Sequence, residues 1–295
     1  KYGQNNIFYL SAHKNHFNNA LQDYNIKIND LKTEISYFGF RLWHFLSSKR
    51  KLLSKNSIEK FDLIIDLQSK LRNTLILKQI PNRHFYSSTL NFKFCSTHKD
   101  YISTKYDNNN IILNLEKLLN DKIVFRKYDT DLIDNKYFTE AKRLLPDRNY
   151  IGFSITQGNA YRKKSWPIEK FLSVANKILK QNKIPVFFIE RNNIDLINKI
   201  KNEIQNVLIP ELESNLSGPP LVTALSKRLE KAISIDNGIM HMIGLANIPM
   251  TVLFGPTNSK KFSPKIKNIN ILDSKILYNS DEISKIKEED VLNLI

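Results

Sequence analysis

The second half of the sequence alternates short apolar runs with longer amphipathic segments, and this alternation most constrains the fold. The short runs are rich in β-formers and predict strands at 150–155, 184–190, 206–210, 231–235 and 249–255. The segments between them have apolar residues at helical spacing and predict helices at 165–181, 193–204, 219–229 and 238–246. Strands that alternate with helices form parallel sheets with right-handed crossovers, so the pattern predicts a doubly wound α/β domain.

The first half carries a weaker form of the same pattern. Strands are predicted at 6–10, 61–67 and 83–88, and a helix at 70–80. We expect a second α/β domain whose first strand–helix unit is missing. A chain of 295 residues is long enough for two domains. We place the hinge within 130–149 and expect domains of residues 1–145 and 146–295.

The expected topology predicts where a ligand binds in the second domain. Doubly wound sheets bind ligands beyond the carboxyl ends of their strands, where the strand order reverses. If the order is the common 3-2-1-4-5, the first and fourth predicted strands are neighbours at that point. The loops that follow them, 156–167 and 236–238, are both polar and contain glycine. We therefore expect the two loops to form one site.

The residues of these loops suit a diphosphate. Asp236 or Asn237 can cap the helix that begins at Gly238, whose backbone allows close approach of a ligand. The first N–H groups of that helix and its dipole favour an anion, and His241 on the first turn can add a hydrogen bond. The opposite loop contributes Thr156, Gly158, Arg162, Lys163 and Lys164. The alternative is an ordinary turn and cap, with His241 as a core histidine.

The formal net charge of +16 is compatible with nucleic acid or an anionic membrane as partner. Most basic residues are lysines that accompany many Asn and Ile residues, so we favour a biased composition as the explanation. The sequence has no run of like charge, zinc-ligand spacing or glycine-aromatic RNA motif, and we expect no nucleic-acid partner. It has no run of about 18 apolar residues that would span a membrane. A single cysteine, Cys95, fits a reducing cytoplasm.

Residues 36–55 contain a helical apolar stripe followed by basic residues. The stripe consists of Phe38, Leu42, Phe45 and Leu46, and Lys49, Arg50 and Lys51 follow it. An interfacial membrane helix has this pattern, and so does a helix that packs on its own domain. We favour packing on its own domain.

Four segments together resemble one known family. "SIDNGIMHMIGLANIPMTVLFGPT" (234–257) resembles the donor-site segment of the family 9 glycosyltransferases, the ADP-heptose:lipopolysaccharide heptosyltransferases. "KKSWPIEKF" (163–171) resembles their Lys-x-Trp-Pro-x-x-x-Phe segment, and "FDLIIDLQSKLRNTLI" (61–76) resembles an N-terminal segment that contains Asp-Leu-Gln-x-x-x-Arg. "IKEEDVL" (286–292) resembles their terminal helix. The three longer matches occur in the family's order.

The resemblance implies a GT-B-like α/β fold, in which two Rossmann-like doubly wound domains face each other across a cleft. The C-terminal domain would hold a nucleotide sugar, ADP-heptose, and the N-terminal domain a lipid-linked anionic saccharide of the lipopolysaccharide core. The implied activity is transfer of a heptose-like sugar, with no metal or other cofactor. The implied location is the cytoplasm, with peripheral contact to the inner membrane.

The resemblance also assigns roles to particular residues. Lys164 would stabilise the leaving group, and Gly255 and Thr257 would close the rim of the donor site. The expected donor-binding set is Thr156, Gly158, Lys164, Asp236, Asn237, Gly238, His241, Gly255 and Thr257. Glu190 could meet a ribose hydroxyl, although a solvated strand end is favoured. The acceptor-side candidates are Asp66, Gln68 and Arg72. Asp66 could substitute for a base, but a structural or acceptor-binding role is favoured; Arg72 could bind an acceptor anion or lie at the surface.

The sequence also departs from the family pattern. Asn237 replaces the usual Ser or Thr, Ile239 replaces the usual Pro, and residues 156–160 replace a Pro-Gly-Ala loop. The family's general base lies on a Gly-Asp loop after the first strand, whereas residues 1–10 resemble the second strand. We therefore expect the base segment to be missing from this chain. The alternative function is a non-catalytic protein that binds a nucleotide sugar or an anionic glycolipid. A third hypothesis, a protein that binds nucleic acid, is supported only by the positive net charge.

Overall fold

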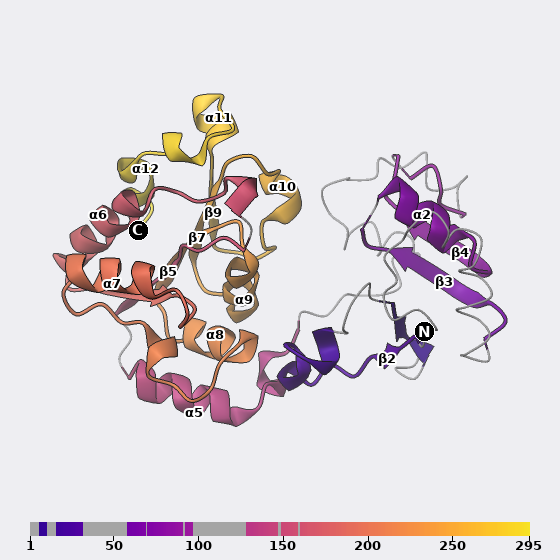
Figure 1. Cartoon of the computed structure of the whole chain (residues 1–295), viewed down its shortest axis with the longest axis horizontal. Helices are drawn as coiled ribbons and strands as arrows, with labels where there is room; N and C mark the ends of the chain where they lie inside the picture. The colour runs from indigo at the N-terminus through magenta and orange to yellow at the C-terminus, as the bar shows by residue number, and fades with distance from the viewer. Residues whose placement is uncertain are drawn as a thin grey trace. The chain divides into compact units, whose positions relative to one another are not determined.

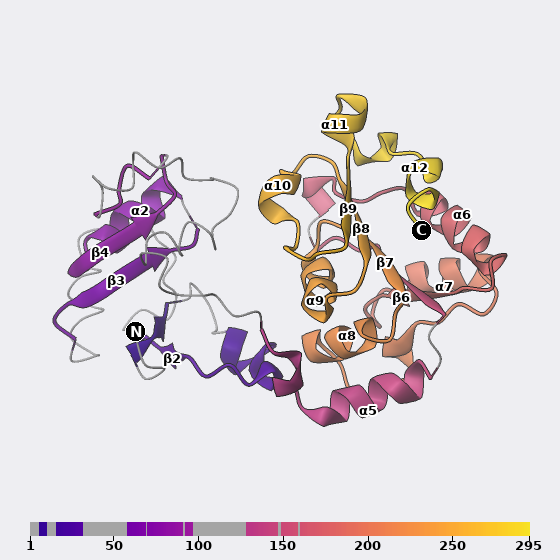
Figure 2. The same ribbon diagram turned by 180° about the vertical axis from the view of Figure 1, so that it is seen from behind.

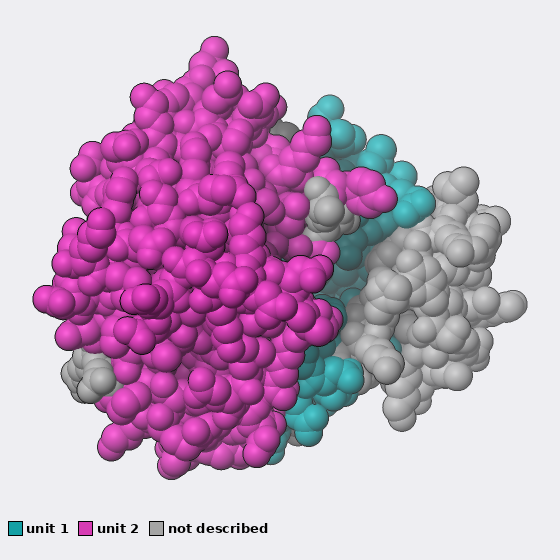
Figure 3. All heavy atoms as spheres, turned by 60° about the vertical axis from the view of Figure 1, so that its left-hand side comes forward, with its two compact units in different colours: residues 1–22, 26–127 teal, residues 23–25, 128–295 magenta. Residues whose placement is uncertain are grey.

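The computed structural model describes residues 6–10, 16–31, 58–68, 70–90, 92–96, 128–146, 149–158 and 160–295. The chain divides into two compact units, which Figure 3 distinguishes by colour. The first consists of residues 1–22 and 26–127, and the second of residues 23–25 and 128–295. Both contain parallel β-strand pairs, which confirms the expected α/β class with parallel sheets.

The second unit is built on a five-stranded parallel sheet with the order β6-β5-β7-β8-β9. Its strands are β5 (Tyr150–Ser154), β6 (Ile184–Phe188), β7 (Lys231–Ile235), β8 (Met250–Phe254) and β9 (Ile269–Asp273). Its helices are α5 (Asn135–Leu144), α6 (Ile168–Leu179), α7 (Ile194–Glu203), α8 (Pro219–Ser226), α9 (Gly238–Ala246), α10 (Ser259–Phe262), α11 (Ser274–Tyr278) and α12 (Glu288–Leu292). Helices α6 and α7 cover one side of the sheet and α9 the other (Figures 1 and 2).

The strand order agrees with the expected 3-2-1-4-5, since β5, β6, β7 and β8 are the first, second, fourth and fifth predicted strands. The predicted third strand, 206–210, is wrong as a full strand. Only Leu208 pairs, in an isolated parallel bridge with Val186. Asn206 has a left-handed φ of 56° at one end, and Pro210 lacks an N–H at the other, so a longer ladder cannot form. The edge strand β9 was not predicted.

The first unit contains two pairs of parallel strands. Strand β3 (Phe61–Asp66) pairs with β4 (Asn82–Ser87), and α2 (Leu71–Lys78) connects them, as predicted. Strand β1 (Phe8–Tyr9) pairs with β2 (Asn29–Asp30). Ile76 and Ile80 form a small core on which Phe61 and Ile64 pack. The stripe at 36–55 lies outside the described residues.

Short 3-10 helices complete the described chain: η2 (His16–Asn18), η3 (Gln22–Tyr24), η4 (Thr130–Leu132), η5 (Ala160–Arg162), η6 (Pro210–Leu212) and η7 (Ile283–Lys285).

Residues 23–25 and 128–145 belong to the second unit. Helix α5 packs on α8, and Tyr24 is buried where its hydroxyl lies 2.7 Å from Thr223 Oγ1. Tyr128 donates a hydrogen bond to the Tyr24 carbonyl at 2.6 Å. The sequence-based division at 145/146 counted residues 128–145 with the first domain, whereas their side chains pack in the second unit.

Candidate functional site

Asn237 joins the two loops that the sequence analysis placed together. Its Oδ1 accepts a hydrogen bond from the N–H of Met240 (2.9 Å), which makes it the N-cap of α9. Its Nδ2 donates to Ser154 Oγ (2.7 Å) and to the Thr156 carbonyl (2.8 Å), at the end of the neighbouring strand β5. Both amide hydrogens are thus engaged, and Asn237 acts as a clamp between the ends of β5 and β7.

Lys164 reaches across the same strand ends and forms an ion pair with Asp236. The two side chains are only 12% and 8% exposed. The Lys164 N–H donates to Gln157 Oε1 at 2.8 Å, and Lys163 before it has a left-handed φ of 47°. This backbone turn directs Lys164 to the strand ends, while Arg162 and Lys163 stay exposed.

His241 lies on the first turn of α9, near the Lys164–Asp236 pair. Its side chain is accessible to solvent, but the surrounding protein desolvates the ring, and this burial lowers the pKa of His241. Asp236 opposes the shift and Lys164 adds to it. The imidazole is therefore neutral near pH 7, and it can donate a hydrogen bond without adding a positive charge.

Three glycines of the expected site differ in what surrounds them. A Cβ added at Gly158 or Gly238 would meet no atom within 4 Å, so the space beside both is open to a ligand. A Cβ at Gly255 would lie 2.8–2.9 Å from Ile283 and from the Asp281 carbonyl. Close packing therefore accounts for Gly255. Within the part of the chain that the structure describes, the enclosed Thr257 hydroxyl has no hydrogen-bond partner.

The arrangement can bind an anion. The positive end of the α9 dipole and the Lys164 ammonium lie at the same strand ends, and both favour negative charge. Asp236 already balances one positive charge, but an ammonium has three N–H donors and can serve a second acceptor beside the carboxylate. Among the described residues, no group of three or more His, Cys, Asp or Glu side chains is arranged to hold a metal ion.

The acceptor-side candidate Asp66 is enclosed in the first unit, with 2% exposure. Its carboxylate accepts hydrogen bonds from Thr74 Oγ1 (2.6 Å), Ser87 Oγ (2.9 Å) and the Gln68 N–H (3.0 Å). This network links β3, α2 and β4. The structural role that the sequence analysis favoured for Asp66 fits these contacts better than a role as base.

The other two acceptor-side candidates lie near the surface. Gln68 is exposed and accepts a hydrogen bond from Asn73 Nδ2 at 2.6 Å. Arg72 is exposed on the first turn of α2. Glu190, after β6, is also exposed, in line with the solvated strand end that was favoured.

Sequence reasoning missed three residues that shape this edge of the sheet: Ser154, Gln157 and Glu211. Ser154 and Gln157 hold the loops through side-chain contacts that no local pattern indicates. Glu211 directly follows the predicted strand 206–210, to which the sequence analysis assigned no site residue.

We predict that Asn237→Asp destabilises the second unit by about 1–3 kcal/mol, because the cap is kept but the Thr156 carbonyl loses its donor. Thermal denaturation measures the change. Asn258→Asp is the matched control, because Asn258 caps α10 in the same way from an exposed position. Equal stabilities of the two variants would contradict the role of Asn237 as a clamp.

The chain resembles known proteins over most of its length. The family model of glycosyltransferase family 9 (heptosyltransferase) matches residues 49–292. A family 9 glycosyl transferase from Veillonella parvula has a TM-score of 0.61 at 17% identity, over 94% of this chain and 84% of that one. The structure of E. coli heptosyltransferase WaaC with ADP has a TM-score of 0.58 at 13% identity, over 92% of this chain and 84% of that one. The structure of E. coli ADP-heptose lps heptosyltransferase II has a TM-score of 0.54 at 14% identity, over 93% of this chain and 84% of that one. No curated protein matches in sequence. These likenesses confirm the expected α/β fold of the GT-B type.

Proposed function

Because the chain belongs to glycosyltransferase family 9, we propose that it transfers a heptose-like sugar from ADP-heptose to a lipopolysaccharide core acceptor. One observation carries the proposal: the Asn237 clamp holds the Lys164–Asp236 pair at the N-terminus of α9. A diphosphate fits this arrangement of charge and N–H groups. The structure of WaaC with ADP, at low identity, supports a nucleotide donor.

In the proposed reaction, an acceptor hydroxyl attacks the anomeric carbon, the bond from that carbon to the diphosphate oxygen breaks, and the hydroxyl proton passes to a base or to water. Negative charge then develops on the departing diphosphate. Lys164 keeps Asp236 as one partner and donates to the diphosphate with another N–H, while the α9 dipole stabilises the same charge. Neutral His241 donates a hydrogen bond. We do not assign the base to Asp66, because three donors of its own unit already surround that carboxylate.

We further propose that the acceptor is a lipid-linked anionic saccharide, and that the protein works in the cytoplasm in peripheral contact with the inner membrane. Lys275 on α11, which forms an exposed ion pair with Asp281 at 3.0 Å, is followed by Ile276 and Leu277, which are 72% and 47% exposed. Apolar side chains beside a cation suit an anionic lipid surface. In the described part of the chain, no helix has the length and apolar character needed to cross a bilayer.

The alternative is a protein that binds the donor without turning it over. The donor site supports this reading equally well, because Lys164, Asp236 and α9 account for binding and none of them is a base for the acceptor. Binding of ADP-heptose without release of ADP would distinguish it from a transferase.

The experiment combines the protein, ADP-heptose and a lipid-linked core acceptor in anionic vesicles. We expect ADP to be released and the acceptor to gain the mass of one heptose, with the same rate when a chelator is present. Sedimentation of the protein with these vesicles at low salt, but not with neutral vesicles, tests the membrane contact. Tight donor binding with no mass gain would support the alternative, and neither binding nor transfer would overturn both.

A further inference from the structure

The second unit carries a basic surface along the β9 edge of its sheet. We call it the β9 surface; it consists of α10, β9, α11 and the connection between α10 and β9, residues 259–278. The one acidic residue of this segment, Asp273, is enclosed as the N-cap of α11. The segment has five lysines, all exposed: Lys260, Lys261, Lys265, Lys267 and Lys275.

The protein itself balances little of this positive charge. Lys275 forms the ion pair with Asp281. The other four lysines form no ion pair with a described residue. Lys265 donates to the Lys260 carbonyl at 3.1 Å, a contact that does not neutralise its charge. Four ammonium groups are therefore available to an anionic partner.

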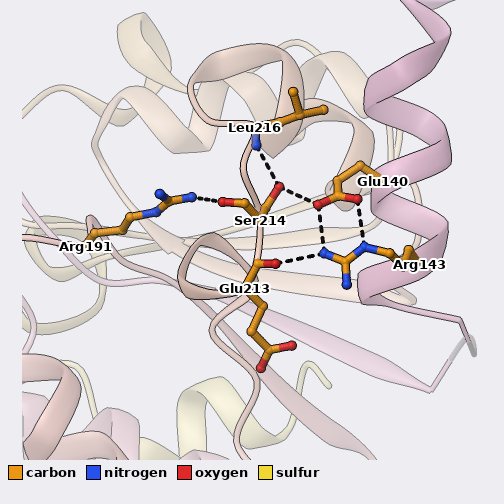
Figure 4. Close-up of polar contacts among 6 residues, drawn as sticks. All are labelled: Glu140, Arg143, Arg191, Glu213, Ser214 and Leu216. Atoms are coloured by element: carbon orange, nitrogen blue, oxygen red, sulfur yellow. Dashed lines mark hydrogen bonds and ion pairs between the residues drawn. The ribbon is translucent and has the colours of Figure 1, made fainter.

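Other cations of the second unit are engaged by their own fold. Figure 4 shows Arg143, whose guanidinium contacts the Glu140 carboxylate and the Glu213 carbonyl, both at 2.8 Å. Arg191 donates to the Ser214 carbonyl in the same network. These contacts hold α5 to the loop that precedes α8. The four lysines of the β9 surface have no comparable contacts, so holding the fold together does not account for them.

Apolar side chains are exposed among these lysines. Phe262, the last residue of α10, is 40% exposed, and the Lys261 ammonium lies 5.4 Å from the centroid of its ring. Ile271 on β9 and Ile276 and Leu277 on α11 are exposed as well. A surface that combines apolar side chains with lysines suits anionic lipid, because the apolar groups enter the interface while the ammonium groups meet the phosphates.

The two helices of this surface begin beside the proposed donor site. They follow the carboxyl ends of β8 and β9, which pair up to their last residues. Lys275 on α11 donates to the Pro256 carbonyl at 3.1 Å, which joins α11 to the segment that leads into α10. Pro256 lies between Gly255 and Thr257, the residues expected at the donor-site rim. The β9 surface therefore adjoins the donor edge of the sheet.

Other roles account for only part of this surface. Lysines beside an edge strand discourage its pairing with another chain. That role explains the charge, but the exposed Phe262, Ile276 and Leu277 would favour association rather than prevent it. An acidic protein or a nucleic acid would likewise use the charge and gain little from separate apolar side chains. A bilayer with anionic headgroups uses both.

We propose that the β9 surface binds anionic phospholipid and places the donor edge of the second unit beside the bilayer. This assignment rests on the proposed function, which requires a lipid-linked acceptor, and it adds the face on which the protein meets the lipid. The stripe at 36–55, the segment with an interfacial pattern in the sequence, belongs to the other unit. Because a lipid-linked acceptor stays in the bilayer, a donor site beside the membrane brings the two substrates together.

The first arm of the test removes charge. It measures partition of the full chain onto vesicles that contain phosphatidylglycerol and onto vesicles of phosphatidylcholine alone. We expect Lys260→Gln with Lys261→Gln to lower affinity for the anionic vesicles about tenfold or more, since each lysine near such a surface contributes about fivefold. Salt should weaken the wild type more than this variant. Lys180→Gln with Lys201→Gln is the matched control; it removes two exposed lysines from α6 and α7 and should bind as the wild type does.

The second arm removes an apolar side chain. Ile276→Ser should lower affinity for the anionic vesicles about fivefold, the gain expected when half of an isoleucine side chain leaves water. Ile194→Ser is the matched control, because Ile194 is 61% exposed and also lies on the first turn of its helix, α7. It should leave partition unchanged. Residues 36–55 are intact in every variant.

ADP binding and sedimentation without vesicles separate the remaining outcomes. Equal vesicle affinity of the wild type and the β9-surface variants would overturn the assignment of this surface. It would also be overturned if Lys260→Gln with Lys261→Gln lost ADP affinity, or if Ile276→Ser lost only self-association, because the surface would then serve the donor or a second copy. A wild type that binds ADP but no vesicle would overturn the membrane contact alone. Failure of the wild type to bind ADP would overturn the proposed function itself.

Discussion

Lys164→Ala is expected to lower the rate of sugar transfer by roughly 10²–10³-fold, the usual effect of removing one preorganised group that stabilises developing charge. The Lys164 side chain is only 12% exposed, and the Gln157 contact and the turn at Lys163 direct it to the strand ends. In the proposed reaction, it is therefore prepositioned for the departing diphosphate. Single-turnover assays with saturating donor measure the loss, and a rate close to that of the wild type would contradict the assigned role.

Two controls separate the ammonium from its side effects. Lys163→Ala removes a neighbouring exposed lysine and should leave the rate nearly unchanged. Lys164→Ala also leaves Asp236 as an enclosed carboxylate without its cation beside an anionic ligand. Adding Asp236→Asn to Lys164→Ala removes the repulsion between the Asp236 carboxylate and the anionic ligand. If the ammonium itself stabilises the leaving group, the double variant should regain donor affinity but not the rate.

The architecture of the second unit was largely predictable because its signals are local. Each strand is a short run with buried residues on both faces, and each crossover helix carries an apolar stripe. Such periodicity survives without knowledge of the partner elements. The third strand failed because pairing depends on backbone conformation at Asn206 and on the missing N–H of Pro210. Strand β9 was missed because, as an edge strand, it is less buried than its neighbours and gives a weaker pattern.

The candidate site likewise has features that could be predicted from the sequence and features that could not. A cap at Asp236 or Asn237 could be predicted, because capping depends on residues adjacent in sequence. The Lys164–Asp236 pair joins residues 72 positions apart; the assumed strand order predicted that their loops meet, but not that these two side chains form an ion pair. The clamp from Asn237 to Ser154 and the raised pKa of Glu211 could not be predicted, because they depend on tertiary distances and on burial.

Trp166→Ala is expected to destabilise the second unit by about 3–5 kcal/mol, the usual range for removing a buried aromatic side chain. Trp166 is 2% exposed, and its ring packs edge-on against the Phe171 ring with 4.8 Å between the ring centroids. Its Nε1 donates a hydrogen bond to the Ile286 carbonyl at 3.0 Å. It therefore anchors the chain before α12 to the start of α6. Because Lys164 lies two residues earlier, nucleotide affinity should fall with stability. Urea denaturation and ADP binding measure the two effects.

Two further variants divide this loss into packing and hydrogen bonding. Trp166→Phe keeps most of the packing but loses the donor, and it should cost about 0.5–1.5 kcal/mol. The cost stays small because Lys170 Nζ also donates to the Ile286 carbonyl, at 2.8 Å, and keeps it paired. Tyr161→Ala removes an aromatic side chain that is 96% exposed on the same loop, and it should change stability by less than about 0.5 kcal/mol. Equal losses in Trp166→Ala and Tyr161→Ala would show that Trp166 does not anchor the C-terminal segment.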